Sequence, residues 1–94
     1  MEKVIWTKRS LASLRKIWEF YSEKDAILAD RIIEEIISTI ENIQFAKQYQ
    51  IEERLSKNHR RAIVRHFKII YLANKDEIQV LTVFDTRQNP GKLK

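Results

Sequence analysis

Basic side chains gather in the second half of this chain, where they are well suited to binding or catalysis. Residues 57–94 hold nine Lys/Arg and three Asp/Glu, a net charge of +6, whereas residues 1–56 have a net charge of −1. A cationic segment attracts polyanions such as nucleic acid or an acidic protein, and cations can stabilise a pentacoordinate phosphorus. His59 stands just before the basic stretch and is a candidate base for proton transfer. The simpler alternative is a surface tuned for solubility.

Three further polar residues are expected to have structural roles in turns or in short-range hydrogen bonds. His66 is expected to lie in a turn or to be a partly buried imidazole, and Asp85 to make local hydrogen bonds or to pair with a cation such as Arg87. His59 and His66 are seven residues apart and the chain has no Cys, so the sequence predicts no metal site and no cofactor.

Length and composition limit the class of protein. The chain has 94 residues, 44% of them hydrophobic, which is enough for one domain spanning residues 1–94. The absence of Cys excludes a disulfide-stapled scaffold, and one Gly and one Pro exclude collagen-like or low-complexity sequence. No apolar run approaches the roughly 18 residues of a membrane span, and the N-terminus lacks the apolar region of a signal peptide. We therefore expect a cytoplasmic protein without a membrane partner.

Two amphipathic helices are predicted after a short N-terminal strand at 3–6. The first, 8–21, has its apolar stripe at Leu11, Leu14, Ile17, Trp18 and Tyr21. The second, 23–45, follows a capping pattern at 22–25 and has its stripe at Ala26, Ala29, Ile33, Ile36, Ile37, Ile40 and Ile43. The short break between them predicts an α-hairpin, and Trp6 and Trp18 are expected in the core.

Three strands are predicted from Arg60 onward. Residues 46–59 have no clear period and are read as a loop, with a turn of helix or extended chain as alternatives. The segments after it are rich in Val, Ile, Phe, Tyr and Thr, which favour strands. Turns are expected at 65–66 and at 74–76. The predicted order is strand, helix, helix and a meander of three strands.

A turn at 65–66 gives a register in which each strand has two distinct faces. One face, expected to pack on the helices, contains Ala62, Val64, Phe67, Ile69, Tyr71, Ile78, Val80 and Phe84. The opposite face contains Arg61, Ile63, Arg65, Lys68, Ile70, Leu72, Leu81 and Val83. Two helices cannot cover both faces, so this second face, apolar with a rim of cations, is a candidate interaction surface. Alternatively, the 46–59 loop or a homodimer partner covers it.

The element order and two segments resemble the RelE/ParE superfamily. These segments are Arg61-Ala-Ile-Val-Arg-His-Phe-Lys-Ile-Ile-Tyr71 and Val83-Phe-Asp-Thr-Arg-Gln-Asn-Pro90. The superfamily contains the toxins of bacterial type II toxin–antitoxin systems, including plasmid stabilisation proteins. The resemblance implies an α+β fold of order β-α-α-β-β-β, with the N-terminal strand and the helix hairpin packed on one face of an antiparallel sheet.

The resemblance implies two different toxic activities. RelE-like toxins are endoribonucleases that cut mRNA on the ribosome without a metal, and the expected function is such ribosome-dependent, RNA-binding growth inhibition. The alternatives are a ParE-like poison of DNA gyrase with no chemistry of its own, or a non-toxic, degenerate binding module. In each case a cognate antitoxin with a disordered segment is the expected partner, and the oligomeric state stays open.

The resemblance also assigns residues to these roles. It implies Arg61, Lys68 and Arg87 as catalytic cations, with Glu53 or His59 as the candidate acid or base. Lys68 stands where the family has Arg, and an ammonium cannot make the bidentate phosphate contact of a guanidinium. The chain ends without the late Tyr or His-Tyr of some nucleases. The residues expected to bind the antitoxin are Arg61, Ile63, Arg65, Ile70, Leu72 and Leu81.

Overall fold

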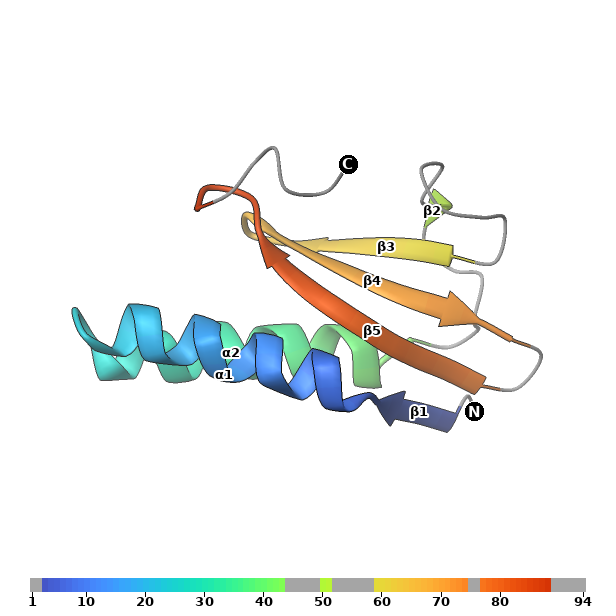
Figure 1. The fold of residues 1–94 in the computed structure, drawn as a ribbon, viewed down its shortest axis with the longest axis horizontal. Helices are drawn as coiled ribbons and strands as arrows, with labels where there is room; N and C mark the ends of the chain where they lie inside the picture. Colours follow the sequence, from blue (N-terminus) through green and yellow to red (C-terminus); the bar gives the residue numbers. More distant parts are fainter. Residues whose placement is uncertain (1–2, 44–49, 52–58, 75–76, 89–94) are drawn as a thin grey trace.

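A computed structural model describes residues 3–43, 50–51, 59–74 and 77–88, and it places two helices against one face of a sheet (Figure 1). In chain order the elements are β1 (Lys3–Trp6), α1 (Lys8–Ser22), α2 (Ala26–Glu41), β2 (Gln50–Ile51), β3 (His59–Val64), β4 (Phe67–Ala73) and β5 (Glu77–Asp85). The predicted α+β order is confirmed, with the two-residue β2 as an addition from the 46–59 stretch. Among the described residues, no helix is both long and apolar enough to cross a bilayer.

The sheet is mixed rather than antiparallel throughout. Its strand order is β1-β5-β4-β3-β2, and β1 runs parallel to β5 while the other neighbours are antiparallel. The parallel pair arises because the chain passes through both helices and the whole meander before β5 returns beside β1. The first and last strands are thereby hydrogen-bonded to each other, and the helix hairpin is held under the sheet (Figure 1).

The predicted register of the β3–β4 hairpin is confirmed. Val64 pairs with Phe67, and Ile63 pairs with Lys68, across a two-residue turn at 65–66. Arg65, the first turn residue, has φ 55°, the left-handed conformation that tight hairpin turns require and that most side chains disfavour. Side-chain alternation along the paired strands, rather than strong turn residues, therefore determines where this hairpin folds.

The faces of β5 differ from the prediction because of an irregularity. The register between β4 and β5 shifts between Ile70 and Tyr71, so that Tyr71 pairs with Val80 and Ile70 pairs with Thr82. Beyond this bulge the inward and outward positions are exchanged. Val83, expected to face outward, is buried in the core, and Phe84, expected inside, is half-buried beside Lys68 on the other face.

The bounds of α1 are within one residue of prediction, but α2 is shorter than the predicted 23–45 at both ends, since it begins at Ala26 and ends at Glu41. The capping pattern at 22–25 was assigned to Ser22, whereas Ser22 is the last residue of α1. Asp25 is the N-cap of α2, and its carboxylate accepts hydrogen bonds from the backbone N–H groups of Ile27 and Leu28. An aspartate at this position satisfies backbone donors that the helix itself leaves unpaired.

The buried stripes of both helices are rotated from the predicted ones. In α1, Leu14 and Ile17 are buried, but Leu11 and Trp18 are exposed. In α2 the buried residues are Ala29, Ile32, Ile36 and Ile40, so Ile32 joins the core while Ala26 and Ile37 are exposed. Isoleucines on nearly every side of α2 made its buried face ambiguous in the sequence. Packing on Phe67, Ile69 and Tyr71 of β4 decides which of them face inward.

Candidate functional site

The two predicted strand cations lie on one face of the sheet, as the sequence indicated. Lys68 is directly opposite Ile63 on β3, and Arg61 is opposite Ile70, two rungs further along. Phe84 of β5 stands on the other side of Lys68. This outer face is the side away from the helices, and Ile63 is 57% exposed on it. We call Arg61, Ile63, Lys68 and Phe84 the outer cationic face.

Other residues assigned to antitoxin binding are less exposed to solvent or already bonded within the chain. Ile70 is only 1% exposed and offers almost no contact area, while Leu72 and Leu81 are half-buried. Arg65 makes a bidentate ion pair with Glu35 of α2, with Nε and Nη2 at 2.9 and 2.8 Å from its carboxylate oxygens. In this conformation Arg65 ties the hairpin turn to the helix layer.

Among the described residues, His59 lies at the opposite end of the β3–β4 hairpin from His66 and Arg87. His59 begins β3 opposite Leu72, and His66 lies in the turn at the other end of the hairpin. Arg87 is exposed in the turn after β5, where its backbone N–H donates to Asp85 Oδ1 at 3.0 Å. Glu53 lies outside the described residues. The structure therefore separates His66 and Arg87 from His59 by the length of β3.

A compact polar cluster that the sequence did not predict lies at the end of the sheet. Tyr21 Oη, from α1, donates to Asp85 Oδ2 at 2.6 Å and is 2.9 Å from His66 Nε2. Asp85 Oδ2 also accepts from Gln88 Nε2 at 2.7 Å, and the backbone N–H of Thr86 donates to the His66 carbonyl at 3.1 Å. We call Tyr21, His66 and Asp85 the tyrosine cluster. It joins α1 to the β3–β4 turn and to the end of β5.

The charges of this cluster follow from its hydrogen bonds. Burial first, and then the bond to Asp85, raise the pKa of Tyr21 to about 12, so its hydroxyl keeps its proton. Burial lowers the pKa of His66, although the Asp85 carboxylate opposes this, so the imidazole is neutral at pH 7. Burial also acts to raise the pKa of Asp85, but the bonds from Tyr21 and Gln88 outweigh it and hold that pKa below its usual value.

The tautomer of His66 can be assigned from the same geometry. Tyr21 gives its only hydroxyl proton to Asp85, so Tyr21 Oη is an acceptor toward His66. His66 Nε2 must therefore carry the hydrogen in the neutral ring, with Asp85 Oδ1 3.4 Å from the same nitrogen. The cluster is thus internally satisfied, with each proton already directed at a partner within it. Tyr21 and Asp85 are 64 residues apart, so no local sequence motif could predict the tyrosine cluster.

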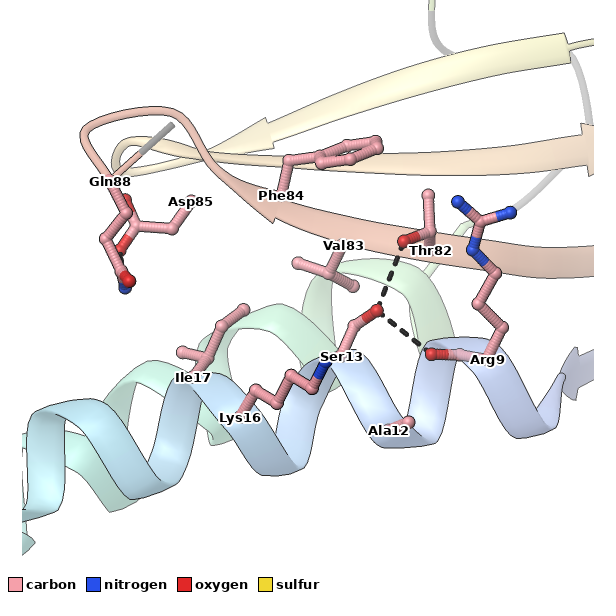
Figure 2. Close-up of a pocket in the computed structure, with 10 residues that line it drawn as sticks. All are labelled: Arg9, Ala12, Ser13, Lys16, Ile17, Thr82, Val83, Phe84, Asp85 and Gln88. Atoms are coloured by element: carbon pink, nitrogen blue, oxygen red, sulfur yellow. Dashed lines mark hydrogen bonds between the residues drawn. The ribbon is translucent and has the colours of Figure 1, made fainter. Parts of the chain in front are cut away.

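A cleft of about 320 Å³ lies between α1 and the second half of β5 (Figure 2). Ser13 Oγ donates to the Arg9 carbonyl at 2.9 Å and is 3.1 Å from Thr82 Oγ1, so Thr82 is the donor to Ser13. This bond joins helix to strand at the cleft, with the Arg9 side chain extending toward β5 beside it (Figure 2). The lining residues are Arg9, Ala12, Ser13, Lys16, Ile17, Thr82, Val83, Phe84, Asp85 and Gln88.

The backbone of β5 beside this cleft lacks a neighbouring strand on one side. β1 pairs with β5 only up to Val80, and Thr7 then ends that pairing with bonds from its N–H and Oγ1 to the Val80 carbonyl at 3.2 and 2.7 Å. Within the described part of the chain, residues 82–85 are paired as a strand with β4 alone. The cleft therefore combines two cations with a strand edge of the kind that extended peptides join.

Comparison with known proteins assigns the family. The family profile described as "ParE toxin of type II toxin-antitoxin system, parDE" matches residues 4–90, nearly the whole chain. The chain belongs to the ParE toxin family. The RelE/ParE resemblance drawn from the sequence is thereby confirmed at the level of the family.

A solved structure shares the fold of this ParE family member. It is titled "Chromosomal ParDE TA system from P. aeruginosa" and superposes with a TM-score of 0.76 at 20% sequence identity. The match covers 90% of this chain and 96% of that one. At this identity the likeness shows the fold alone. No curated protein matches the chain.

The arrangement of polar groups in this ParE family member suits binding better than proton transfer. The cations of the outer cationic face lie on one side of the sheet, and the tyrosine cluster lies at its end, bonded to α1. The described residues contain no group of three or more His, Cys, Asp or Glu that could hold a metal. Acid–base catalysis needs a proton donor or acceptor within hydrogen-bond reach of the reacting atoms. Tyr21 and Asp85 direct their hydrogen-bonding capacity at each other instead.

Proposed function

We propose that this chain is the toxin of a type II toxin–antitoxin module and that it inhibits DNA gyrase by binding, with no chemistry of its own. The membership in the ParE family supports this over the mRNA cleavage expected from the sequence. The observation that carries it is the separation between the strand cations and the tyrosine cluster. Arg61 and Lys68 share the outer face, whereas Tyr21, His66 and Asp85 are bonded to one another at the helix side.

The competing nuclease function rests on the same cations. Arg61 and Lys68 lie two rungs apart and could contact neighbouring phosphates, and His59 is the described imidazole on that part of the sheet. A nuclease would need His59, or Glu53 outside the described residues, to move protons there. Substitution of His59 and Glu53 together should therefore abolish toxicity if the chain is a nuclease and leave it largely intact if the chain acts by binding.

The test is a supercoiling assay with purified toxin and gyrase, run beside primer extension on cellular mRNA after induction. We expect inhibited supercoiling and intact transcripts, with Lys68→Glu losing inhibition at least about tenfold because it reverses a charge on the contact face. Lys24→Glu, an equal charge change in the exposed turn between α1 and α2, is the matched control. Unaffected gyrase together with cuts inside translated codons would overturn the proposal in favour of the nuclease.

We further propose that the cognate antitoxin neutralises this toxin by placing an extended acidic segment in the cleft between α1 and β5. Within the described residues, 82–85 pair as a strand with β4 alone, so their other edge can offer backbone hydrogen bonds, and Arg9 and Lys16 offer complementary charge. The outer cationic face stays a second proposed contact of the same partner, through Arg61, Ile63 and Leu72. Lys16→Glu should weaken antitoxin binding about tenfold in a titration, whereas Lys24→Glu should not. Equal affinities of the two variants would remove the cleft from the interface.

A further inference from the structure

Apolar side chains remain exposed along the outer seam of the helix hairpin, away from the sheet and the cleft. Leu11 is 53%, Trp18 40% and Ile37 36% exposed. Trp18 Nε1 donates to Asp30 Oδ1 at 2.8 Å, which places these two residues side by side on antiparallel helices. Leu11 is seven residues before Trp18, and Ile37 is seven after Asp30, so the two are also level with each other. We call Leu11, Trp18 and Ile37 the hairpin seam.

The two helices that flank the seam carry opposite charge. α1 holds four Lys/Arg and one Glu, whereas α2 holds four Asp/Glu and one Arg. Arg9 and Lys16 line the cleft and Glu35 pairs with Arg65, which leaves a net charge of +1 on α1 and −2 on α2. The hairpin is therefore basic along one side of the seam and acidic along the other. Such a surface is complementary to itself, because a second copy can place its basic helix on the acidic helix of the first.

We propose that the hairpin seam is the interface of a homodimer. The charge pattern selects its symmetry. A two-fold axis parallel to the helices sets α1 of one copy over α2 of the other and brings the two seams together at the axis. An axis across the helices would instead set α1 over α1 and oppose like charges. The first arrangement buries Leu11, Trp18 and Ile37 from both copies, while Trp18 Nε1 keeps its bond to Asp30.

One charge pair can be named from this symmetry. The contact between Trp18 and Asp30 fixes which residues are level along the hairpin, and Arg15 is then level with Glu34 or its neighbour. Both are exposed, and Arg15 Nε lies 3.8 Å from Glu19 Oε2. Across the axis Arg15 would meet Glu34 of the partner subunit. Glu35, the next residue, is directed to Arg65 on the other flank of α2 and does not take part.

The dimer leaves both proposed binding regions accessible. The sheet and the hairpin form separate layers, so the outer cationic face is on the opposite side of the molecule (Figure 1). The cleft opens on the β5 flank of α1, through Arg9, Ser13 and Lys16, rather than on the flank of Leu11 and Trp18. The dimer inference therefore does not depend on which target the toxin binds.

Sedimentation of the purified chain tests the interface. We expect a dimer at about 100 µM, a monomer for Glu34→Lys, and a dimer again when Glu34→Lys is combined with Arg15→Glu. Lys68→Glu, on the opposite layer, should leave the dimer intact. A monomeric parent chain at that concentration, or a double variant that stays monomeric like Glu34→Lys, would overturn the proposal.

Cross-linking tests the symmetry separately. The chain has no Cys, so Arg15→Cys and Glu34→Cys each introduce a single thiol at an exposed position. The two sites lie at nearly the same level of the hairpin, on different helices. A mixture of the two variants should form a disulfide-linked heterodimer, and neither variant alone should cross-link to itself to the same extent. Preferential self-linking of Arg15→Cys would instead show α1 packed on α1 and contradict the proposed axis.

Discussion

The end of the sheet and its outer face use polar residues in opposite ways. In the tyrosine cluster, Tyr21, His66 and Asp85 direct their hydrogen bonds at one another and join three segments of the chain. On the outer cationic face, Arg61 and Lys68 flank the exposed side chain of Ile63. The first arrangement joins parts of the fold, whereas the second leaves an apolar side chain exposed beside cations, which we propose as a contact for a partner. The surroundings of the polar groups thus suggest different roles for the two regions.

This contrast predicts how substitutions separate stability from activity. A change in the tyrosine cluster should lower the free energy of unfolding, because its groups are buried or half-buried and depend on one another. A change on the outer cationic face should alter binding and leave unfolding nearly unchanged. The predictions below begin with the largest effect.

Asp85→Ala should cause the largest loss of stability, about 2–4 kcal/mol. Asp85 is buried and accepts from Tyr21 Oη, Gln88 Nε2 and the backbone N–H of Arg87, and its removal leaves these donors without their acceptor. Urea unfolding followed by circular dichroism measures the change. Glu41→Ala is the control, because Glu41 is exposed and accepts one long bond from Trp6 Nε1 at 3.4 Å. Similar losses in the two variants would contradict a stabilising role for the cluster.

Ile63→Asp should weaken binding and leave the free energy of unfolding nearly unchanged. Ile63 is 57% exposed beside Lys68, so an aspartate costs little in the free chain. In a complex it would bury a charge on an apolar contact, and we expect affinity for the antitoxin or the toxin's target to fall at least about tenfold. Calorimetric titration and urea unfolding measure the two quantities on the same sample. A large loss of stability with unchanged affinity would show that Ile63 belongs to the fold rather than to the interface.

The sequence was informative where side chains alternate regularly along an element. The pairing of β3 with β4, the turn at 65–66 and the shared face of Arg61 and Lys68 all followed from alternation, and all are confirmed. Alternation failed at β5, because a bulge between Ile70 and Tyr71 exchanges the faces beyond it. Nothing in a run of alternating β-branched and apolar residues marks such a shift. Val83 and Phe84 were therefore assigned to the wrong sides.

Contacts between segments that are distant along the chain could not be predicted from the sequence either. His66 was expected in a turn or partly buried, and Asp85 in local hydrogen bonds, and both expectations are confirmed. Their common partner was missed, because Tyr21 appeared only as one apolar position of the first helix. The exposed positions of Leu11 and Trp18 were missed for a related reason. A helical stripe gives the apolar side of a helix but not which part of it a neighbouring helix leaves uncovered.

The pH dependence of stability should report the tyrosine cluster through His66. Its pKa in the folded chain lies below the ordinary value of about 6.5, so the folded state binds fewer protons than the unfolded state as pH falls below 6.5. Stability is therefore fully present above pH 6.5 and decreases below it, before the Asp85 contribution is lost at still lower pH. Unfolding at a series of pH values should show this first decrease. His66→Gln should remove it and His59→Gln should not; a decrease that survives in His66→Gln would assign it to another group.

Arg65→Asn should give the smallest change, and it probes the link between the hairpin turn and the helix layer. Arg65 has φ 55°, which asparagine adopts more readily, and this should add up to about 0.5 kcal/mol of stability. The same substitution removes the ion pair with Glu35, whose partners are both partly exposed. Glu35→Gln weakens that pair without changing the turn, so the difference between the two variants isolates the backbone gain. If Arg65→Asn is less stable than Glu35→Gln in urea, the side chain of Arg65 must contribute more to the turn than its backbone conformation costs.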